Sequence, residues 1–293
     1  MATDRPQWRL HVGAHKTATT HLQDTLLSRL VDLDQAGLHF ISRDRLLIAG
    51  LIRYLRFGEV KRKGLTERLV LKTEDACMRH RLLKRMRTHD RVLISEERIL
   101  GRATDLLQGF YPELETYLGT LARIIGDDPV ALFLSIRSQA DVLPSAYSQA
   151  LRTHNRPRPF DTIVGEWLET PPRWVELIER LKRALPGASL KVWTFEEYVA
   201  DPARVIAALT GHEDLQIAEL TRPERTRRLT AEAVSALEKV QPLDLSEDEK
   251  HMATARAAEL AGPNFDPLND QQREIFARVY AEDVAKIPTS CRL

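Results

Sequence analysis

A short polar segment near the amino terminus combines a glycine, a lysine and three threonines. Gly13 ends an apolar run, Lys16 follows three residues later, and Thr17, Thr19 and Thr20 lead into a stretch with helical spacing. Backbone N–H groups and the positive end of the helix dipole bind anions at such a position, and a lysine adds a point charge. These residue types in this order predict an anion site.

The spacing within this segment differs from that of a Walker A loop. That loop, GxxxxGK[ST], has a glycine directly before its lysine, whereas His15 precedes Lys16 here. The sequence also offers no DxD or Walker B cluster to hold a metal ion, so a P-loop small-molecule kinase is disfavoured. An ordinary strand-to-helix turn with a threonine N-cap is an alternative for the same residues.

A second candidate phosphate site lies in the middle of the chain. The apolar run VALFLSI leads directly into Arg137, and Ser145 follows eight residues later in a segment of helical character. An arginine at the carboxyl end of a strand and a serine in the next helix can reach one phosphate together. Taken alone, the pair also fits a salt-bridged strand end and a helix residue beside Pro144.

Two adjacent carboxylates, Glu96 and Glu97, follow the apolar run RVLIS. If this run is a strand, the two side chains point in opposite directions, and one of them is a candidate general base for a hydroxyl group. The alternative is that both pair with neighbours such as Arg98 or cap the next helix. His15 is a further candidate base because it lies within the anion-binding segment itself.

Short apolar, β-branched runs alternate with longer amphipathic segments along the whole chain. This alternation predicts a parallel sheet with helices on both faces, which binds ligands at the carboxyl ends of its strands. The unbroken run VALFLSI predicts a central strand, whereas the alternating WRLHV could lie closer to an edge. The predicted strands are residues 8–12, 38–41, 92–94, 130–136 and 190–193.

We therefore expect one α/β domain spanning residues 1–293, with about five parallel strands in a P-loop NTPase-like topology. The first helix should begin at Thr19 or Thr20, and the part after Thr221 should be mainly helical, with a last helix ending near Ile287. The Pro- and Arg-rich residues 155–160 should form a loop near the site. Two basic segments, residues 61–64 and 222–228, could line a pocket, although such runs are more often solvated.

Bulk composition restricts the possible partners. The 43 Lys and Arg nearly balance the 42 Asp and Glu, so neither a nucleic acid nor an anionic membrane surface is an expected partner. No stretch has the length and apolar character of a membrane-spanning helix, and the first residues lack the pattern of a signal peptide. Two cysteines without metal-ligand spacing fit a reducing compartment, and we expect a cytoplasmic protein.

Two of these motifs together resemble a known family, the PAPS-dependent sulfotransferases, where PAPS is 3′-phosphoadenosine-5′-phosphosulfate. HKTATT resembles the HKTGTT loop of bacterial sulfotransferases, with Ala18 in place of the family glycine. The pattern RxxxxxxxSxYxQ, which begins at Arg137, is similar to the family's 3′-phosphate signature. RVLISEE resembles the SSE motif, whose glutamate aligns with Glu97. The segment WTFEEYVADP and the last helix also resemble the family, in an architectural role.

The resemblance implies a sulfotransferase that transfers the sulfuryl group of PAPS to an acceptor hydroxyl and releases adenosine 3′,5′-bisphosphate, with no need for a metal ion. Family analogy favours a carbohydrate or small metabolite as acceptor. A nucleotide-binding protein without catalytic activity is an alternative, because an alanine with positive φ costs on the order of 1 kcal/mol and could alter the loop. The implied catalytic residues are Lys16, Glu97, Glu96 and His15. The implied donor-binding residues are Gly13, Ala14, Lys16, Thr17, Ala18, Thr19, Thr20, Arg137 and Ser145. Within the same signature we expect Tyr147 to pack in the core and Gln149 to face the acceptor.

Overall fold

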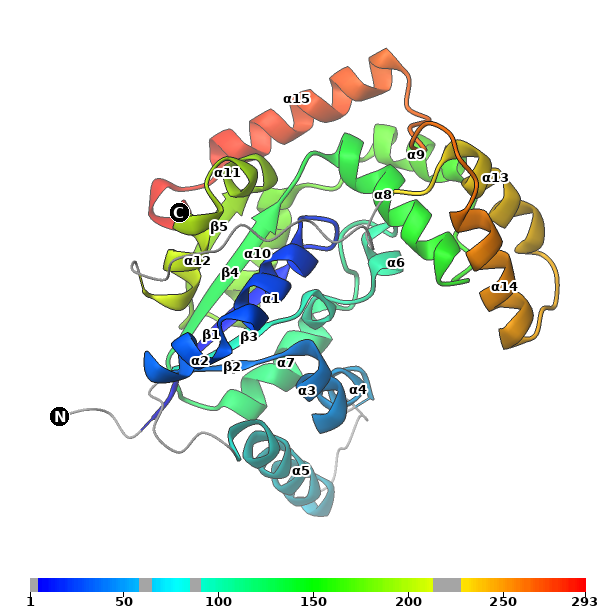
Figure 1. Ribbon diagram of the computed structural model, residues 1–293. Coiled ribbons are helices and arrows are strands. Elements are labelled where there is room, and N and C mark those ends of the chain that lie inside the picture. Colours follow the sequence, from blue (N-terminus) through cyan, green and yellow to red (C-terminus); the bar gives the residue numbers. More distant parts are fainter. Residues whose placement is uncertain (1–4, 58–64, 85–90, 213–227) are drawn as a thin grey trace.

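A five-stranded parallel sheet forms the centre of the molecule (Figure 1). The computed structural model describes residues 5–57, 65–84, 91–212 and 228–293. Its strands are β1 (Gln7–Gly13), β2 (Leu38–Ile41), β3 (Arg91–Ser95), β4 (Val130–Ile136) and β5 (Ser189–Thr194). They lie in the order β2-β3-β1-β4-β5, and every pairing is parallel. The predicted fold class, a parallel sheet flanked by helices, is confirmed.

β1 occupies the centre of the sheet, and its predicted place nearer an edge is wrong. The alternation in WRLHV has another cause: Trp8, Leu10 and Val12 join the core on one face, and polar residues face the other. There Arg9 donates a hydrogen bond to the Leu209 carbonyl at 2.7 Å, and His11 stacks on a tryptophan. Because Arg9 and the Nδ1 atom of His11 find hydrogen-bond partners there, a central strand can carry these polar residues.

Helices cover both faces of the sheet. On one face, apolar residues of α1 (Thr19–Ser28), α2 (Leu30–Gln35) and α12 (Pro202–Thr210) form a core with β2–β5 side chains. On the other face, α5 (Leu65–Leu83), α7 (Leu114–Ile125) and α10 (Trp174–Ala184) contribute to the larger core. α1 begins at Thr19, as predicted from the leucine spacing.

The remaining helices follow the strands or build the carboxyl-terminal part. α3 (Arg43–Ala49) and α4 (Leu51–Phe57) come after β2, and η1 (Glu97–Ile99) and α6 (Ala103–Leu106) after β3. α8 (Gln139–Arg152) and α9 (Phe160–Glu169) follow β4, and α11 (Phe195–Ala200) follows β5. Residues 155–159 between α8 and α9 are outside helices, as predicted, whereas Phe160, the last residue of the predicted loop, already begins α9.

The carboxyl-terminal part is helical, as expected, with α13 (Ala231–Val240), α14 (Glu247–Ala258), α15 (Asp270–Lys286) and the short η3 (Thr289–Cys291). α13 packs against α14 and α8, and α15 packs against α8, α9 and α10 (Figure 1). Asn269 caps α15 by accepting the backbone N–H of Gln272, which satisfies a donor that the helix leaves free. In the described part of the chain, no helix combines the length and apolar character needed to cross a membrane.

Candidate functional site

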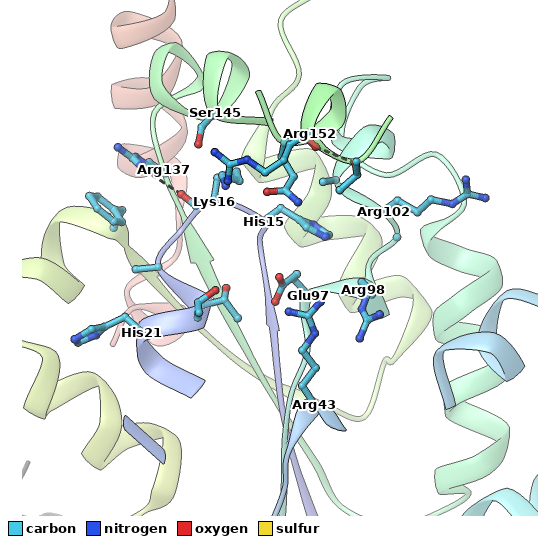
Figure 2. Close-up of a pocket in the computed structure, with 18 of the residues that line it drawn as sticks. His15, Lys16, His21, Arg43, Glu97, Arg98, Arg102, Arg137, Ser145 and Arg152 are labelled. Carbon is cyan, nitrogen blue, oxygen red and sulfur yellow. Dashed lines mark hydrogen bonds between the residues drawn. The ribbon is translucent and has the colours of Figure 1, made fainter. Parts of the chain in front are cut away.

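A large pocket of about 1180 Å³ opens where the strands end (Figure 2). Its lining comes from segments that follow all five strands, because the carboxyl ends of parallel strands meet at one edge of the sheet. Among the described residues that line it, Glu97 is the one carboxylate. The cations that line it are Lys16, Arg43, Arg56, Arg98, Arg102, Arg137, Arg152 and Arg228. This excess of positive charge favours the binding of anions in the pocket.

The loop between β1 and α1 contains residues with positive φ, a conformation that glycine adopts most easily. Gly13, Lys16 and Ala18 have φ values of 90°, 68° and 67°. Ala18 is also the N-cap residue of α1 and lies in the left-handed region, where a Cβ atom costs roughly 1–2 kcal/mol. The alanine therefore keeps the conformation that glycine favours, and the loop retains its shape at the cost of local strain. Such loops present backbone N–H groups to anions.

The three threonines of the loop have different surroundings. The Thr17 hydroxyl donates to the Ala14 carbonyl at 2.6 Å and contacts the Ser135 hydroxyl, so it ties the loop to β4. Thr17 does not line the pocket, and the expected role of its hydroxyl as an anion ligand is corrected accordingly. Thr19 and Thr20, at the first turn of α1, do line it.

Lys16 is largely buried within this cationic pocket. Burial, together with the charge of Arg152, lowers its pKa from 10.5 to about 8, and the charge of Glu97 acts in the opposite direction. The ammonium group therefore stands in a site where its charge is unfavourable. An anion bound next to it would remove this penalty.

Arg137 joins the end of β4 to the loop. Its guanidinium donates to the Lys16 carbonyl at 3.1 Å, lies 4.0 Å from the centre of the Phe195 ring, and stands 3.7 Å from an Asp141 oxygen. Its Nε is buried without a hydrogen-bond partner in the described residues. Ser145 lines the pocket on the facing turn of α8 (Figure 2). The predicted arginine and serine are thus brought to one site.

Arg228 belongs to the second basic segment of the sequence and also lines the pocket. Its guanidinium donates to the Asp141 carbonyl at 3.2 Å and lies 3.5 Å from an oxygen of the Asp141 carboxylate. Asp141 therefore stands between Arg137 and Arg228 and holds both guanidinium groups at the rim. Residues 61–64 and 222–227 lie outside the described part of the chain.

Sequence reasoning missed Arg152 as a site residue. It lines the pocket together with Ser145 and Gln149, and Figure 2 shows its side chain beside Lys16. Ser145, Gln149 and Arg152 are separated by four and then three residues, so their side chains lie on one face of α8. The signal was present in the sequence, since Arg152 extends the pattern RxxxxxxxSxYxQ by one more helical turn. Tyr147, in contrast, is buried in the core as expected.

Glu96 and Glu97 have separate roles. Glu96 is buried, caps η1 by accepting the Arg98 N–H, and forms a two-point ion pair with the Arg98 guanidinium at 2.8 and 2.7 Å. It does not line the pocket, and its candidacy as a base is corrected because both of its oxygens are engaged. The alternative interpretation, pairing with Arg98 and helix capping, holds for Glu96.

Glu97 faces the pocket. Its Oε2 atom is buried and has no hydrogen-bond partner among the described residues. Burial raises the pKa of this carboxyl group above 4.5, and the charge of Glu96 raises it further, while Arg43 and Arg98 partly oppose the shift. A carboxylate with a free oxygen and a raised pKa has the properties of a general base.

His15 is held by Tyr111. The His15 backbone N–H donates to the Tyr111 hydroxyl at 3.0 Å, and His15 Nδ1 lies 2.9 Å from the same oxygen. Among the described residues Nδ1 is the one acceptor within reach of the Tyr111 hydroxyl proton, which favours the tautomer with the ring proton on Nε2. Burial, with the charges of Lys16 and Arg98, lowers the His15 pKa to about 3. The ring is therefore neutral, and it suits a hydrogen-bond donor better than a base.

No protein-family model matches this chain, and neither does any curated protein sequence. Among solved structures it is similar to a sulfotransferase from Alicyclobacillus acidocaldarius, with 18% identity and a TM-score of 0.45 over 88% of this chain and 95% of that one. It is also similar to a retinol dehydratase in complex with androsterone and inactive cofactor PAP, with 14% identity and a TM-score of 0.38 over 97% of this chain and 82% of that one. Since both TM-scores are below 0.5, these similarities establish nothing about the activity of this chain.

The arrangement can bind a polyanion and remove a proton beside it. The loop and Lys16 form one cationic subsite, and Arg137, Ser145 and Arg228 form a second one on the β4 side. Glu97 supplies a carboxylate close enough for its charge to act on Lys16. Within the described residues, no group of three or more His, Cys, Asp or Glu side chains is arranged to hold a metal ion.

Proposed function

We propose that this chain is a sulfotransferase that uses PAPS as donor and a hydroxyl compound as acceptor. The observation that carries the proposal is the position of Glu97, a carboxylate with an unpartnered oxygen in a pocket whose other charged lining residues, among those described, are cations. A pocket that served only to bind anions would gain from a neutral residue there. A base is required when a bound nucleophile must lose a proton beside an anionic donor.

The residues present fit a doubly phosphorylated nucleotide. The loop and Lys16 suit the 5′-phosphosulfate, because backbone N–H groups and a desolvated ammonium stabilise its negative charge. Arg137 and Ser145 suit the 3′-phosphate, and the free Nε of Arg137 offers a donor without a partner in the described protein. The rings of Phe195 and Tyr198 lie along the same side of the pocket and offer apolar surfaces to a base.

PAPS, when bound, supplies an activated sulfuryl group whose leaving group is the 5′-phosphate. Lys16 stabilises the charge that develops on this leaving oxygen, and Glu97 accepts the proton of the acceptor hydroxyl as the hydroxyl attacks from the opposite side. The neutral His15 ring can donate from Nε2 to an oxygen of the transferred group. Positioning and electrostatic stabilisation supply most of the catalysis, as in phosphoryl transfer.

A kinase requires carboxylates that hold Mg²⁺ next to the phosphates. Among the described residues that line this pocket, Glu97 alone has a carboxylate, and the surrounding arginines would repel a divalent cation. The donor side of the pocket therefore favours a donor that needs no metal clamp.

The test is calorimetric titration with adenosine 3′,5′-bisphosphate, run beside ATP with Mg²⁺. We expect micromolar or tighter binding of the bisphosphate, and at least tenfold weaker binding by Arg137→Ala and Lys16→Ala, because each removes a charged hydrogen-bond donor. Arg53→Ala, an exposed arginine on α4 outside the pocket, is the matched control and should bind normally. Binding of ATP alone would instead support a kinase. Bisphosphate binding without turnover of PAPS would support a nucleotide-binding protein that lacks catalysis.

A further inference from the structure

The pocket has a second cationic end that the proposed donor does not use. Donor binding is assigned to segments after β1, β4 and β5. Arg43 on α3, Arg56 on α4 and Arg102 before α6 lie on the other side, after β2 and β3. The sheet order β2-β3-β1-β4-β5 separates the two ends, with the loop after β1 between them. This second end is where an acceptor would approach Glu97.

The positive charge at this end exceeds what its own carboxylates neutralise. Arg98 is fully paired with Glu96, so that pair adds no net charge. Glu97 remains as one negative charge in a lining that also holds Arg43 and Arg102, and neither of these two arginines forms an ion pair with a described residue. Figure 2 shows the Arg43 side chain directed towards Glu97, and its charge lowers the pKa of that carboxyl group. One carboxylate does not balance these two guanidinium groups, and the net positive field favours a further anion.

Arg43 contributes one of the positive charges that no carboxylate pairs with in the described part of the chain. It is exposed, and its guanidinium makes no hydrogen bond or ion pair with any residue that the structure describes. Arg45, two positions further along α3, is also exposed but does not line the pocket. Arginine can bind a carboxylate, sulfate or phosphate group through two parallel hydrogen bonds, which makes Arg43 a natural contact for such a group.

Apolar side chains accompany the arginines. Ile52, Leu55 and Tyr117 line the same end and give it one surface that can pack against a carbon skeleton or a ring. A site with apolar contacts and a few charged groups selects ligands that carry both features. A free inorganic ion would leave this apolar surface without a contact.

We propose that the acceptor is an anionic hydroxyl compound, one that carries a carboxylate, sulfate or phosphate group on a ring or carbon skeleton. Arg43 and Arg102 bind the anionic group, and the hydroxyl then faces Glu97. The identity of the acceptor rests on the proposed sulfotransferase function, whereas the anion subsite itself does not. The acceptor is thereby defined as a negatively charged compound, where the proposed function alone specifies only a hydroxyl group.

The test compares matched neutral and anionic probes at constant ionic strength. Glucose is compared with glucuronate, glucose 6-sulfate and glucose 6-phosphate, and methyl 4-hydroxybenzoate with 4-hydroxybenzoate. Binding is measured by calorimetry with and without saturating adenosine 3′,5′-bisphosphate, and transfer from PAPS is measured with the same compounds. We expect anionic members to bind at least tenfold tighter than their neutral partners, and the order among the three charged sugars identifies the preferred anion.

The variants are Arg43→Gln and Arg102→Gln, with Arg45→Gln as the matched control. We expect the first two to lose about tenfold in affinity for the anionic probes while their affinity for adenosine 3′,5′-bisphosphate stays unchanged. Arg45→Gln should behave as the unmodified protein. The unchanged bisphosphate affinity also shows that each variant is folded.

Equal binding of neutral and anionic partners, or no binding of any anionic probe at millimolar concentration, would overturn the proposal. The same holds if Arg43→Gln and Arg102→Gln match the Arg45→Gln control. A different result would contradict the proposed sulfotransferase function: adenosine 3′,5′-bisphosphate itself would not bind. An anion preference that persists without bisphosphate and disappears in Arg43→Gln would then still support the subsite.

Discussion

Gly13 and Glu97 pack against each other so closely that a Cβ atom on Gly13 would lie 2.8 Å from the Cβ of Glu97. Gly13 also has a φ of 90°, which is unfavourable for any residue with a side chain. The glycine that ends β1 therefore permits the carboxylate after β3 to approach the anion-binding loop. Two separate sequence motifs are joined at this contact.

Substitution of Gly13 by alanine should combine backbone strain with overpacking. We expect Gly13→Ala to lower the free energy of unfolding by about 2–4 kcal/mol and to abolish transfer, because Glu97 must move away. Denaturation with urea and an assay of sulfuryl transfer measure the two effects. Gly37→Ala is the control, because Gly37 has a φ of 73° but no atom lies within 4 Å of the position that a Cβ atom would occupy there. It should lose only about 1 kcal/mol, and equal losses would contradict the packing argument.

The two adjacent glutamates should respond differently to the same change. Glu97→Gln should reduce kcat by about 10²–10⁴-fold, as expected for loss of a general base, while adenosine 3′,5′-bisphosphate binds at least as tightly because a negative charge is removed. Glu96→Gln should mainly lower stability, by about 1–3 kcal/mol, since it weakens the ion pair with Arg98. Urea denaturation and steady-state kinetics of both variants separate these effects. A larger loss of kcat in Glu96→Gln would reverse the assignment.

The pH dependence of kcat/KM should be bell-shaped. Glu97 must be ionised to accept a proton, and its pKa is raised, so activity should rise with pH through a value above the ordinary 4.5 of a glutamate. Lys16 must be protonated, and its pKa is lowered to about 8, so activity should fall as the pH passes through that value. In Lys16→Arg, the alkaline limb should move beyond about pH 10, because a guanidinium remains charged there. An alkaline limb that stays near pH 8 in this variant would show that another group causes it.

Ala18 holds a left-handed conformation that glycine would adopt without steric cost. Ala18→Gly relieves roughly 1–2 kcal/mol of strain but adds about 0.5–1 kcal/mol of chain entropy to the unfolded state, so stability should change by less than about 1.5 kcal/mol. Affinity for adenosine 3′,5′-bisphosphate, measured by calorimetry, should be equal or higher. Ala18→Val should be strongly impaired, since a β-branched residue is poorly tolerated at positive φ. Weaker binding by Ala18→Gly would mean that the Ala18 methyl group itself contributes to the site.

The sequence predicted the parallel sheet, the helix that begins at Thr19, and the position of three motifs at strand ends. These predictions succeed because they depend on local patterns: apolar runs of strand length, leucines at helical spacing, and polar residues directly after a strand. Since the carboxyl ends of parallel strands meet at one edge, the loop after β1, Arg137 and Glu97 were expected to lie together before any contact was known. The fold and the position of the proposed donor side of the pocket follow from this rule.

Only the tertiary structure decided which side chains enter the pocket. The choice between Glu96 and Glu97 depends on a few backbone torsions at the end of β3 and on the pairing with Arg98, which no local pattern specifies. Arg43 reaches the site from a helix after β2 and belongs to none of the recognised motifs, so its part in the pocket is a consequence of sheet order. Local sequence determines the elements and their ends, whereas packing between distant elements determines which charged groups share one cavity.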